Sequence, residues 1–493
     1  WSSKAEYILA LMGYLVMPSG LLRFVTCWVH KGSWSFFIAY LLMLFGLGIP
    51  LLFLEMAVGQ RAQQSSIDLW KTLSPWFGGL GYSMVMVCLI TNTYLNVFNS
   101  WILFYMSHIF HFVVPWDRCP LQKNSSDFGE PVQSHVPPDP ECEQATSYTY
   151  FWYRQTLKAS DSIEDGGQPS FNLAMFLFLA WCLICVFMVN GIKSLGKVLC
   201  VLLQVPYFII ICFLVRTLSM GNGIGYGLNY LLILEVARIS DLTMWCQAGI
   251  QVLFDIGLGF GPVISLSSHM SDFNNCLKDA FLMAMVNLMT SLLSSSVIFL
   301  MLGFWIENSG TPCVERQFME GPGLAYVAFS QAITLFPGSS FWAIIFFMSL
   351  VIMGLGTMTT LVEGIALSLQ KSISTLEKHP KLVPVIICLG GFLGSLVFSS
   401  RPGSYVVFLF DDHLVPMVLI MIVAFQNLSL AWVYGIKRFR AEMFGQLGRL
   451  VWAPFTFLWS YVTLPTLLVL LTIYFLNLYF SESLSYVSWN NSM

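Results

Sequence analysis

The sequence predicts an all-α polytopic membrane protein, and two observations lead to this fold class. First, the 493 residues are 57% hydrophobic and only 10% charged, with a mean hydropathy of +0.73, whereas soluble domains are about a quarter charged. Second, apolar runs of about 20 residues, the length that crosses a bilayer as a helix, recur along the chain. The formal net charge of -3 gives no sign of a polyanionic partner, so nucleic-acid binding is not expected.

Eleven apolar segments are long enough to span a bilayer. They cover residues 5–26, 34–59, 77–112, 171–189, 196–218, 244–269, 280–305, 340–370, 381–400, 404–436 and 451–478. Lysine and arginine collect after the second, fourth, eighth and tenth segments, at positions 61, 71, 193, 197, 371, 378, 381, 437, 438 and 440. By the positive-inside rule these connections are cytoplasmic, and the N-terminus is expected on the same side.

The long polar insert at 113–170 then lies outside the cytoplasm. It contains the sequon that begins at Asn124 and two of the twelve cysteines, Cys119 and Cys142. We expect a glycan on Asn124 and a disulfide between the two cysteines, because the non-cytoplasmic side allows both. An unmodified loop with two free thiols is the alternative.

Two of the apolar segments contain helix-breaking residues. The first holds Pro18, Ser19 and Gly20, followed by Arg23, and the sixth holds the stretch DIGLGFG at 255–261. Backbone groups freed by a break cannot face lipid, so a break must line a cavity or pack inside the protein. Two kinks that merely ease helix packing are the simpler alternative.

The interrupted segments stand first in each half of the chain, and each lies beside an ionisable group. This arrangement indicates a transporter made of inverted five-helix repeats, with a ligand site at the midplane. The repeats would be 1–218, which includes the insert 113–170, and 235–436. Residues 451–478 would follow as an eleventh helix of the same single domain.

Several stretches resemble signatures of the neurotransmitter:sodium symporter family, solute carrier family 6, over essentially the whole chain. They are GIPLLFLEMAVGQ (48–60), QVLFDIGLGFG (251–261), FNNCLKDA (273–280) and AWVYGIKRF (431–439). The stretches ECEQATSYTYFWYRQTL (141–157) and GLGTM (354–358) are similar to the amino-acid branch, in particular to its divergent orphan type. The resemblance implies the LeuT-like fold with broken first and sixth helices. It also implies that the twelfth helix is absent or truncated, because the chain stops at Met493.

The resemblance assigns a solute pocket, and the sequence departs from the family there. The implied lining residues are Tyr14, Leu15, Pro18, Ser19, Leu95, Phe254, Asp255, Phe260 and Thr357. Pro18 replaces a leucine whose N–H faces the carboxylate of an amino-acid solute, and Leu95 replaces a tyrosine whose hydroxyl meets the same group. Each lost hydrogen bond to a charged group is worth about 1.5 to 3 kcal/mol. Zwitterionic amino acids are therefore expected to bind weakly.

The resemblance also implies two sodium sites and a chloride site. The sodium ligands would come from Gly13, Leu15, Val16, Asp255, Asn287, Met353 and Thr357, although Gly20 replaces the asparagine that supplies an oxygen to the first sodium. The chloride site would be formed by Tyr40, Gln251 and Ser291, next to Asp255. Carbonyl and hydroxyl oxygens suit a small hard cation.

Asp255 stands where family members usually carry serine, alanine or threonine. Its carboxylate could replace chloride, repair the first sodium site that Gly20 has damaged, or bind a cationic ligand. A protonated, hydrogen-bonded buried acid is the fourth alternative. If the carboxylate replaces the anion, Na⁺ remains the coupling ion and chloride is dispensable.

Arg23 and Asp411 match the pair that closes the extracellular path in the family. An isolated guanidinium inside a membrane span is costly without a partner, which favours this gate over ordinary packing. The neighbouring acids Asp411 and Asp412 are better explained by the gate than by catalysis. The polar loops show no nucleophile–base pair or nucleotide motif, so we do not expect an enzyme.

Taken together, these residues favour a sodium-coupled symporter of a small amino-acid-like or amine solute that works by alternating access. The protein would be a multi-pass component of the plasma membrane or an intracellular vesicle membrane, with the solute and the bilayer as its partners. A transport-silent family member that regulates other membrane proteins is the alternative. The sequence does not indicate an oligomeric state.

Glycosidase treatment tests the topology. We expect the protein from a eukaryotic host to lose mass on the gel after treatment, and Asn124→Gln to remove this shift, because the insert faces the compartment where glycans are added. Non-reducing peptide mapping should recover Cys119 linked to Cys142. Free thiols at both cysteines would place the insert in the cytoplasm and contradict the topology.

Overall fold

The computed structural model describes residues 1, 3–30, 34–109, 114–120, 139–189, 192–221, 224–232, 236–271, 273–309, 323–447 and 453–480. In these residues the regular structure is helical, and the one β-bridge joins Pro169 to Ser400. This confirms the all-α class. Residues 481–493, where a twelfth helix was expected to be absent or truncated, lie outside the described part.

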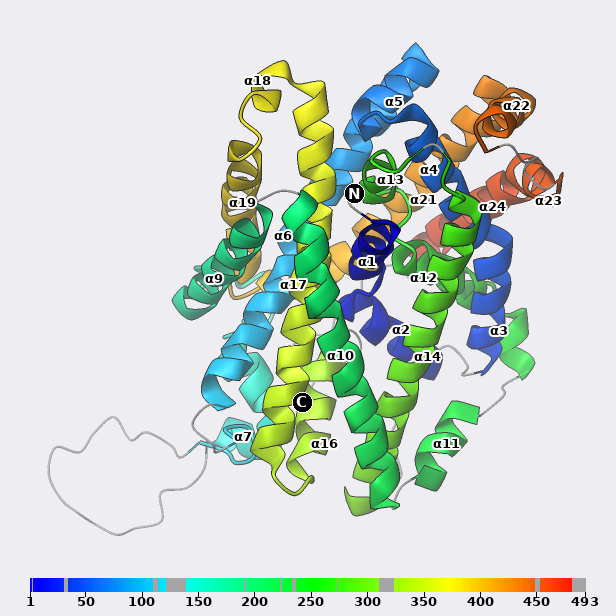
Figure 1. Ribbon diagram of the computed structural model, residues 1–493. Helices are drawn as coiled ribbons and strands as arrows, with labels where there is room; N and C mark the ends of the chain where they lie inside the picture. Colours follow the sequence, from blue (N-terminus) through cyan, green and yellow to red (C-terminus); the bar gives the residue numbers. More distant parts are fainter. Residues whose placement is uncertain are drawn as a thin grey trace, which may run out of the picture.

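Long helices and broken helix pairs follow one another along the chain (Figure 1). They are α1 (Lys4–Leu15) with α2 (Pro18–His30), α3 (Trp34–Met43) with α4 (Ile49–Ala62), α6 (Gly78–Ile109), α9 (Phe171–Met188), α10 (Ile192–Met220), α12 (Leu242–Asp255) with α13 (Pro262–Ser267), α14 (Cys276–Ser309), α17 (Ser339–Ser372), α19 (Leu382–Ser395), α20 (Gly403–Leu409) with α21 (Val415–Leu428), and α24 (Thr463–Phe480).

Shorter helices connect the long ones. They include α5 (Ser66–Leu73), α7 (Pro140–Gln144), α8 (Ser147–Tyr150), α11 (Ile224–Leu232), α16 (Ser330–Thr334), α18 (Ser374–Glu377), α22 (Ile436–Leu447) and α23 (Ala453–Phe457). Single π-helical turns interrupt several elements, among them η5 (Leu324–Phe329) and η7 (Phe410–Leu414).

The expected spans are recovered within the described residues. Nine helical stretches are long and apolar enough to cross a membrane, and the bent pair α1–α2, whose axes differ by 51°, makes a tenth. The remaining expected span, 244–269, is present as α12 and α13, and each part is too short to cross alone.

Pro18 explains the first break. Proline has no N–H to donate and cannot continue a helical ladder. The N–H of Met17 turns back to the carbonyl of Leu15 at 3.1 Å, and the N–H of Leu21 then bonds to Met17 at 3.1 Å as α2 begins. The backbone between the two helices is therefore a tight turn, with φ -89° and ψ 75° at Val16, and the break that the sequence predicts is present.

Three glycines allow the second break. Gly257, Gly259 and Gly261 have φ values of 61°, 84° and 102°, a region that glycine adopts without steric cost. At Gly257 an added Cβ would also lie 2.4 Å from the ring of Tyr14. A residue with a side chain would fit neither this conformation nor this contact.

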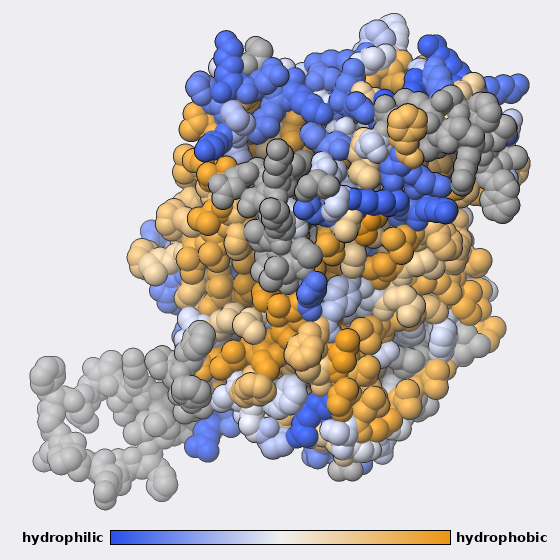
Figure 2. Space-filling view, in the orientation of Figure 1, coloured by the Kyte–Doolittle hydropathy of each residue, from blue (hydrophilic) through white to orange (hydrophobic). Residues whose placement is uncertain are grey.

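The polar ends of the molecule agree with a membrane orientation. An apolar belt separates a strongly polar end from a second polar region in Figure 2. The helices α5, α18 and α22, which lie in lysine- and arginine-containing connections, share one end of the molecule, whereas α7 lies at the other (Figure 1). That the α5 end faces the cytoplasm stays a prediction.

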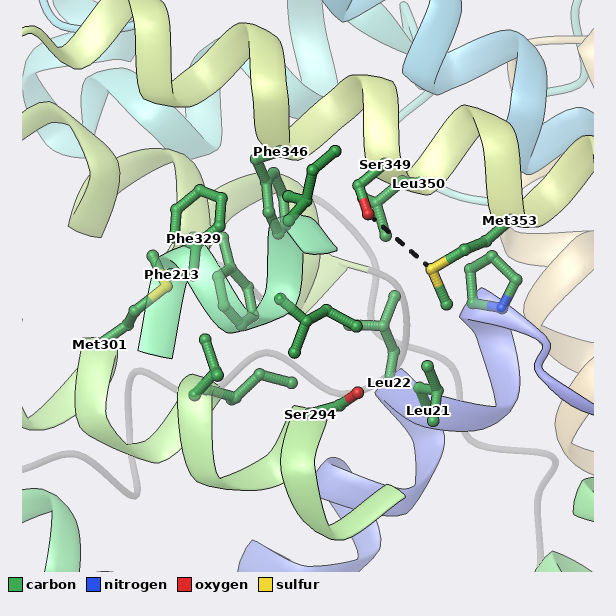
Figure 3. A pocket seen from close by; sticks show the side chains of 15 residues that line it. Leu21, Leu22, Phe213, Ser294, Met301, Phe329, Phe346, Ser349, Leu350 and Met353 are labelled. Carbon is green, nitrogen blue, oxygen red and sulfur yellow. Dashed lines mark hydrogen bonds between the residues drawn. The ribbon is translucent and has the colours of Figure 1, made fainter. Parts of the chain in front are cut away.

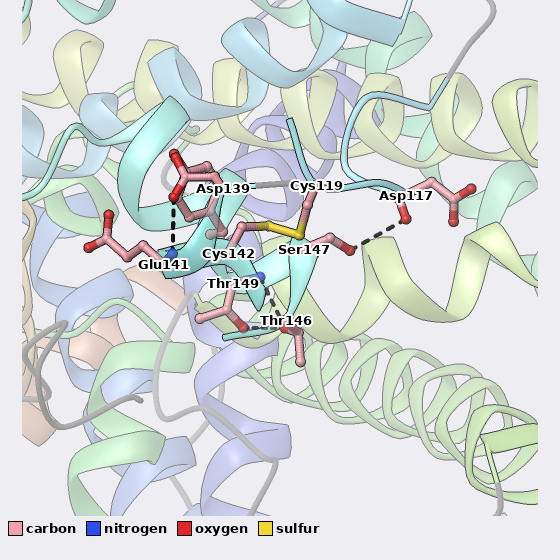
Figure 4. The surroundings of a disulfide bond; sticks show 9 residues. Asp117, Cys119, Asp139, Glu141, Cys142, Thr146, Ser147 and Thr149 are labelled. Atoms are coloured by element: carbon pink, nitrogen blue, oxygen red, sulfur yellow. Dashed lines mark hydrogen bonds between the residues drawn. A yellow bond between two sulfur atoms is a disulfide. The ribbon is translucent and has the colours of Figure 1, made fainter. Parts of the chain in front are cut away.

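A disulfide closes the described part of the large insert. Cys119 and Cys142 are joined, with their Cα atoms 5.8 Å apart, so the expected pair is present (Figure 4). Beside it, the Asp139 side chain accepts a hydrogen bond of 3.0 Å from the N–H of Glu141 and thereby caps α7. Asn124, the expected glycan site, lies outside the described residues.

Candidate solute and ion site between the two broken helices

The two breaks contact each other in the interior. Tyr14, in the last turn of α1, donates a hydrogen bond of 2.7 Å to the carbonyl of Gly257. Glu55 on α4 accepts a hydrogen bond of 2.9 Å from the N–H of Gly259. Both side chains are fully or almost fully buried, so they satisfy backbone groups that the second break would otherwise leave unpaired at membrane depth.

Asp255 ends α12 with its carboxylate between three helices. One oxygen accepts a hydrogen bond of 2.9 Å from the Tyr40 hydroxyl, and the other accepts one of 2.7 Å from the Gln251 amide. That amide also donates to the carbonyl of Gly20 at 3.0 Å. Two of the three residues assigned to a chloride site thus donate to the carboxylate, while the buried hydroxyl of Ser291 has no partner among the described residues.

The carboxylate also lies against the position where the family carries an asparagine. A Cβ added to Gly20 would be 3.1 Å from Asp255 Oδ1, closer than ordinary van der Waals contact. The absence of a side chain at Gly20 therefore leaves the space that the Asp255 carboxylate borders.

Asn287 joins both breaks through its amide. Its nitrogen lies 3.1 Å from the carbonyl of Leu15 and 2.6 Å from that of Asp255, while its side-chain oxygen has no partner among the described residues. Rotating the amide would present three oxygens to one point, because the two amide atoms exchange places. These residues were assigned to the first sodium site.

Oxygens also converge where the second sodium site was assigned. The hydroxyl oxygen of Thr357 lies 3.2 Å from the carbonyl of Gly13, 3.4 Å from that of Val16 and 3.1 Å from that of Met353. A hydroxyl has one proton, so it cannot satisfy all three carbonyls at once. A hard cation prefers such a set of oxygens.

A partly open space of about 310 Å³, which we call the central cavity, lies beside these oxygens. Four residues of the expected solute pocket line it, namely Pro18, Ser19, Leu95 and Thr357. The other five expected members, Tyr14, Leu15, Phe254, Asp255 and Phe260, are not in its lining. The cavity is therefore bounded by α2, α6 and α17, and the described residues of its lining include no charged side chain.

Asn99 is a cavity residue that sequence reasoning missed. Its amide nitrogen donates to Asn96 Oδ1 at 3.0 Å. A Cβ on Gly354, on the facing helix α17, would lie 2.0 Å from Asn99 Oδ1, so glycine is required there. The amides at positions 92, 96 and 99 stand out in an otherwise apolar span, and polar residues inside a span are a signal of function.

The residues assigned to the gate form a closed cluster. Arg23 Nη2 lies 2.8 Å from a carboxylate oxygen of Asp411 and 3.1 Å from one of Asp412, and it also donates to the main-chain carbonyl of Asp411. Tyr94 donates to Asp411 at 3.0 Å. The guanidinium is 4.5 Å from the ring centre of Phe254. Phe254 therefore packs beneath the gate rather than along the cavity.

Two broken spans that meet at the centre of an all-helical membrane protein, beside a cavity and groups of converging oxygens, define a secondary-transporter architecture. A model of the sodium:neurotransmitter symporter family matches residues 1–493. The chain belongs to this family.

Relatives agree with this assignment. The chain is 40% identical to the orphan sodium- and chloride-dependent neurotransmitter transporter NTT5 of Homo sapiens, in an alignment that covers 100% of this chain and 74% of that protein. It is 33% identical to the sodium-dependent neutral amino acid transporter B(0)AT2 of Mus musculus, with 99% and 74% covered. It is also 33% identical to the sodium-dependent neutral amino acid transporter SLC6A17 of Homo sapiens, with 96% and 72% covered.

A methyl group at position 20 tests the contact with Asp255. We expect Gly20→Ala to destabilise the protein by about 1 to 3 kcal/mol, the usual cost of overpacking, because the carboxylate must move away from Tyr40 and Gln251. Adding Asp255→Ser should relieve this cost. Thermal unfolding of the purified variants measures it.

Gly390→Ala is the matched control for that test, because its added Cβ meets nothing within 4 Å. Equal stability of the Gly20 and Gly390 variants would show that the carboxylate does not occupy the space beside position 20.

The gate cluster predicts unequal roles for its two acids. The Asp411 side chain is 11% exposed and that of Asp412 is 55% exposed. Asp411→Asn should cost about 3 to 5 kcal/mol, because it leaves a buried guanidinium without its main partner, whereas Asp412→Asn should cost about 1 kcal/mol or less. The double variant Arg23→Asp, Asp411→Arg should recover part of the loss in thermal unfolding. Equal costs for the two asparagine variants would contradict the assignment of Asp411 as the gate partner.

Proposed function

We propose that the protein is a sodium-coupled symporter of a small amino-acid-like or amine solute. One observation carries the proposal: Thr357 lines the central cavity and also lies among the carbonyl oxygens of Gly13 and Val16. A sodium ion held by these oxygens would share a wall with the solute, so the binding of each would favour the other.

Alternating access would arise from the two breaks. The segments 1–218 and 235–436 are proposed as inverted repeats, with the N-terminus in the cytoplasm. The helices that carry the breaks would move relative to α6 and α17, and the Arg23–Asp411 pair would close the outer path. Tyr14 and Gly257 couple the breaks, because their hydrogen bond spans both.

The residues that line the central cavity limit the class of solute that it can bind. Pro18 offers no N–H and Leu95 offers no hydroxyl, although both side chains line the cavity. A carboxylate would therefore rely on sodium at the first site, through the oxygens near Asn287. This supports solutes for which an apolar body contributes more binding energy than the carboxylate does.

A transport-silent regulatory member is the second candidate, and the loss of the carboxylate contacts at Pro18 and Leu95 favours it. Uptake by proteoliposomes under an imposed inward sodium gradient, screened over neutral amino acids and amines, separates the two candidates. The symporter proposal expects uptake that disappears when an ionophore dissipates the gradient. Sodium-independent binding without uptake across the screen would favour the regulator.

We further propose that Asp255 makes chloride dispensable. Tyr40 and Gln251 already donate to its two carboxylate oxygens, so a tethered anion occupies the place that chloride would take. The same charge would balance a sodium ion held near Asn287. The relative NTT5 is described as sodium- and chloride-dependent. Measuring whether this chain needs chloride therefore tests the proposal directly.

Replacing chloride with gluconate should leave sodium-stimulated binding or uptake unchanged in the unmodified protein. Asp255→Ser should create a chloride requirement, because it removes the fixed charge while keeping a hydroxyl. Sodium-dependent thermal stabilisation in the two salts measures both effects. If the unmodified protein needs chloride, or if Asp255→Asn leaves sodium stabilisation intact, the carboxylate is a neutral acid and not an anion substitute.

A further inference from the structure

A second, larger cavity lies on the other side of Pro18 from the central one. It is lined by residues of α2, α10, α14, η5 and α17, and the partly open space between them is about 600 Å³. Figure 3 shows Leu22, Phe213, Met301, Phe346 and other apolar side chains pointing into it. Among the described residues that line it, none is charged.

The cavity contains two hydroxyl groups that differ in their surroundings. The Ser349 hydroxyl contacts the sulfur of Met353 at 4.0 Å. The Ser294 hydroxyl is buried and has no hydrogen-bond partner among the described residues, and its residue is 7% exposed. In Figure 3 the Ser294 oxygen points toward the apolar side chains of the cavity.

The two serines that follow Ser294 on α14 are hydrogen-bonded, whereas Ser291, three residues earlier and outside this lining, also has no partner among the described residues. The hydroxyl of Ser295 donates to the carbonyl of Ser291 at 2.7 Å, and that of Ser296 donates to Leu292 at 2.8 Å. Serine hydroxyls inside helices can make this bond four residues back. Ser294 lines the cavity but does not make this bond, so its hydrogen-bonding capacity is unused among the described residues.

An unused hydroxyl in an apolar space carries a desolvation cost. We propose that this cavity binds a small uncharged apolar molecule with a single hydroxyl or carbonyl group, which forms a hydrogen bond with Ser294. A charged head group would be left without a partner, because the lining offers none. The site is distinct from the central cavity and does not depend on the identity of the transported solute.

A molecule bound in this second cavity would act on the first broken span. Pro18 lies in the walls of both cavities, and α2 carries the gate residue Arg23. A molecule that contacts α2, α10, α14 and α17 together favours the arrangement in which these helices are close. The ligand therefore stabilises the closed gate and acts as a modulator without competing for the central cavity.

Two probes of equal size test the hydroxyl. Cyclohexanol and methylcyclohexane have the same number of heavy atoms, and only the first can bond to Ser294. We expect cyclohexanol to raise the unfolding temperature of the purified full chain saturably, and Ser294→Ala to weaken its affinity about three- to tenfold because the hydrogen bond is lost. The same substitution should leave the affinity for methylcyclohexane unchanged, and Ser294→Leu should remove binding of both probes by filling the space.

Ser296→Ala is the matched control, because that hydroxyl lies on the same helix but is already bonded to a backbone carbonyl. It should bind both probes as the unmodified chain does. An equal effect of Ser294→Ala on the affinities for the two probes, or an unchanged response in Ser294→Leu, would overturn the proposal. The second result would show that the probe partitions into detergent or lipid-facing surfaces.

Repeating the measurement in sterol-free and sterol-containing nanodiscs identifies the source of the natural ligand. A sterol has the same single hydroxyl on a larger apolar body. Loss of the cyclohexanol response only in sterol-containing discs would assign the site to a molecule from the bilayer. An unchanged response would assign it to a molecule that enters from water.

Discussion

The buried carboxylate of Asp255 constrains the centre of this protein more than any other group. A carboxylate that is almost completely removed from solvent needs donors or a cation close by. Tyr40 on α3 and Gln251 on α12 supply the donors, and the absent side chain at Gly20 supplies the space. Asp255 therefore joins the end of α12 to α3, and the Gln251 amide, which also donates to the carbonyl of Gly20, joins both to the start of α2.

The position of Asp255 also separates the proposed ion sites from the proposed solute cavity. Asp255 is turned toward Tyr40 and Gln251 and is not part of the central cavity. The cavity instead presents the Asn99 amide and the hydroxyls of Ser19 and Thr357. In the proposed mechanism the Asp255 carboxyl group and the solute cavity can vary independently, and Thr357 is the residue that the cavity shares with the proposed second sodium site.

The fold could be predicted from the sequence because its signals are local. Length and hydropathy locate the spans, Pro18 has no N–H, and the glycines at 257, 259 and 261 allow positive φ, so both breaks follow from single residues. The disulfide could be predicted because Cys119 and Cys142 lie in a polar insert that the positive-inside rule places outside the cytoplasm.

The cavity residues could be predicted only in part, because they depend on how helices rotate against each other. Asn99 reaches the cavity only because Gly354 on α17 leaves room for its amide, and no local pattern around position 99 contains that information. Phe254 was expected in the solute pocket, yet its ring lies under the Arg23 guanidinium. The unbonded hydroxyl of Ser294 is likewise indistinguishable in sequence from those of Ser295 and Ser296.

The gate and the two breaks form one mechanical unit. Arg23 lies five residues after Pro18 on α2, and its guanidinium contacts both Asp411 and the ring of Phe254 on α12. Any outward movement of α2 must therefore separate a nearly buried ion pair and uncover an aromatic ring. Both changes cost free energy in a medium of low dielectric constant. Opening therefore requires binding energy that appears only in the open state, and in the proposed mechanism sodium held beside the breaks would supply it.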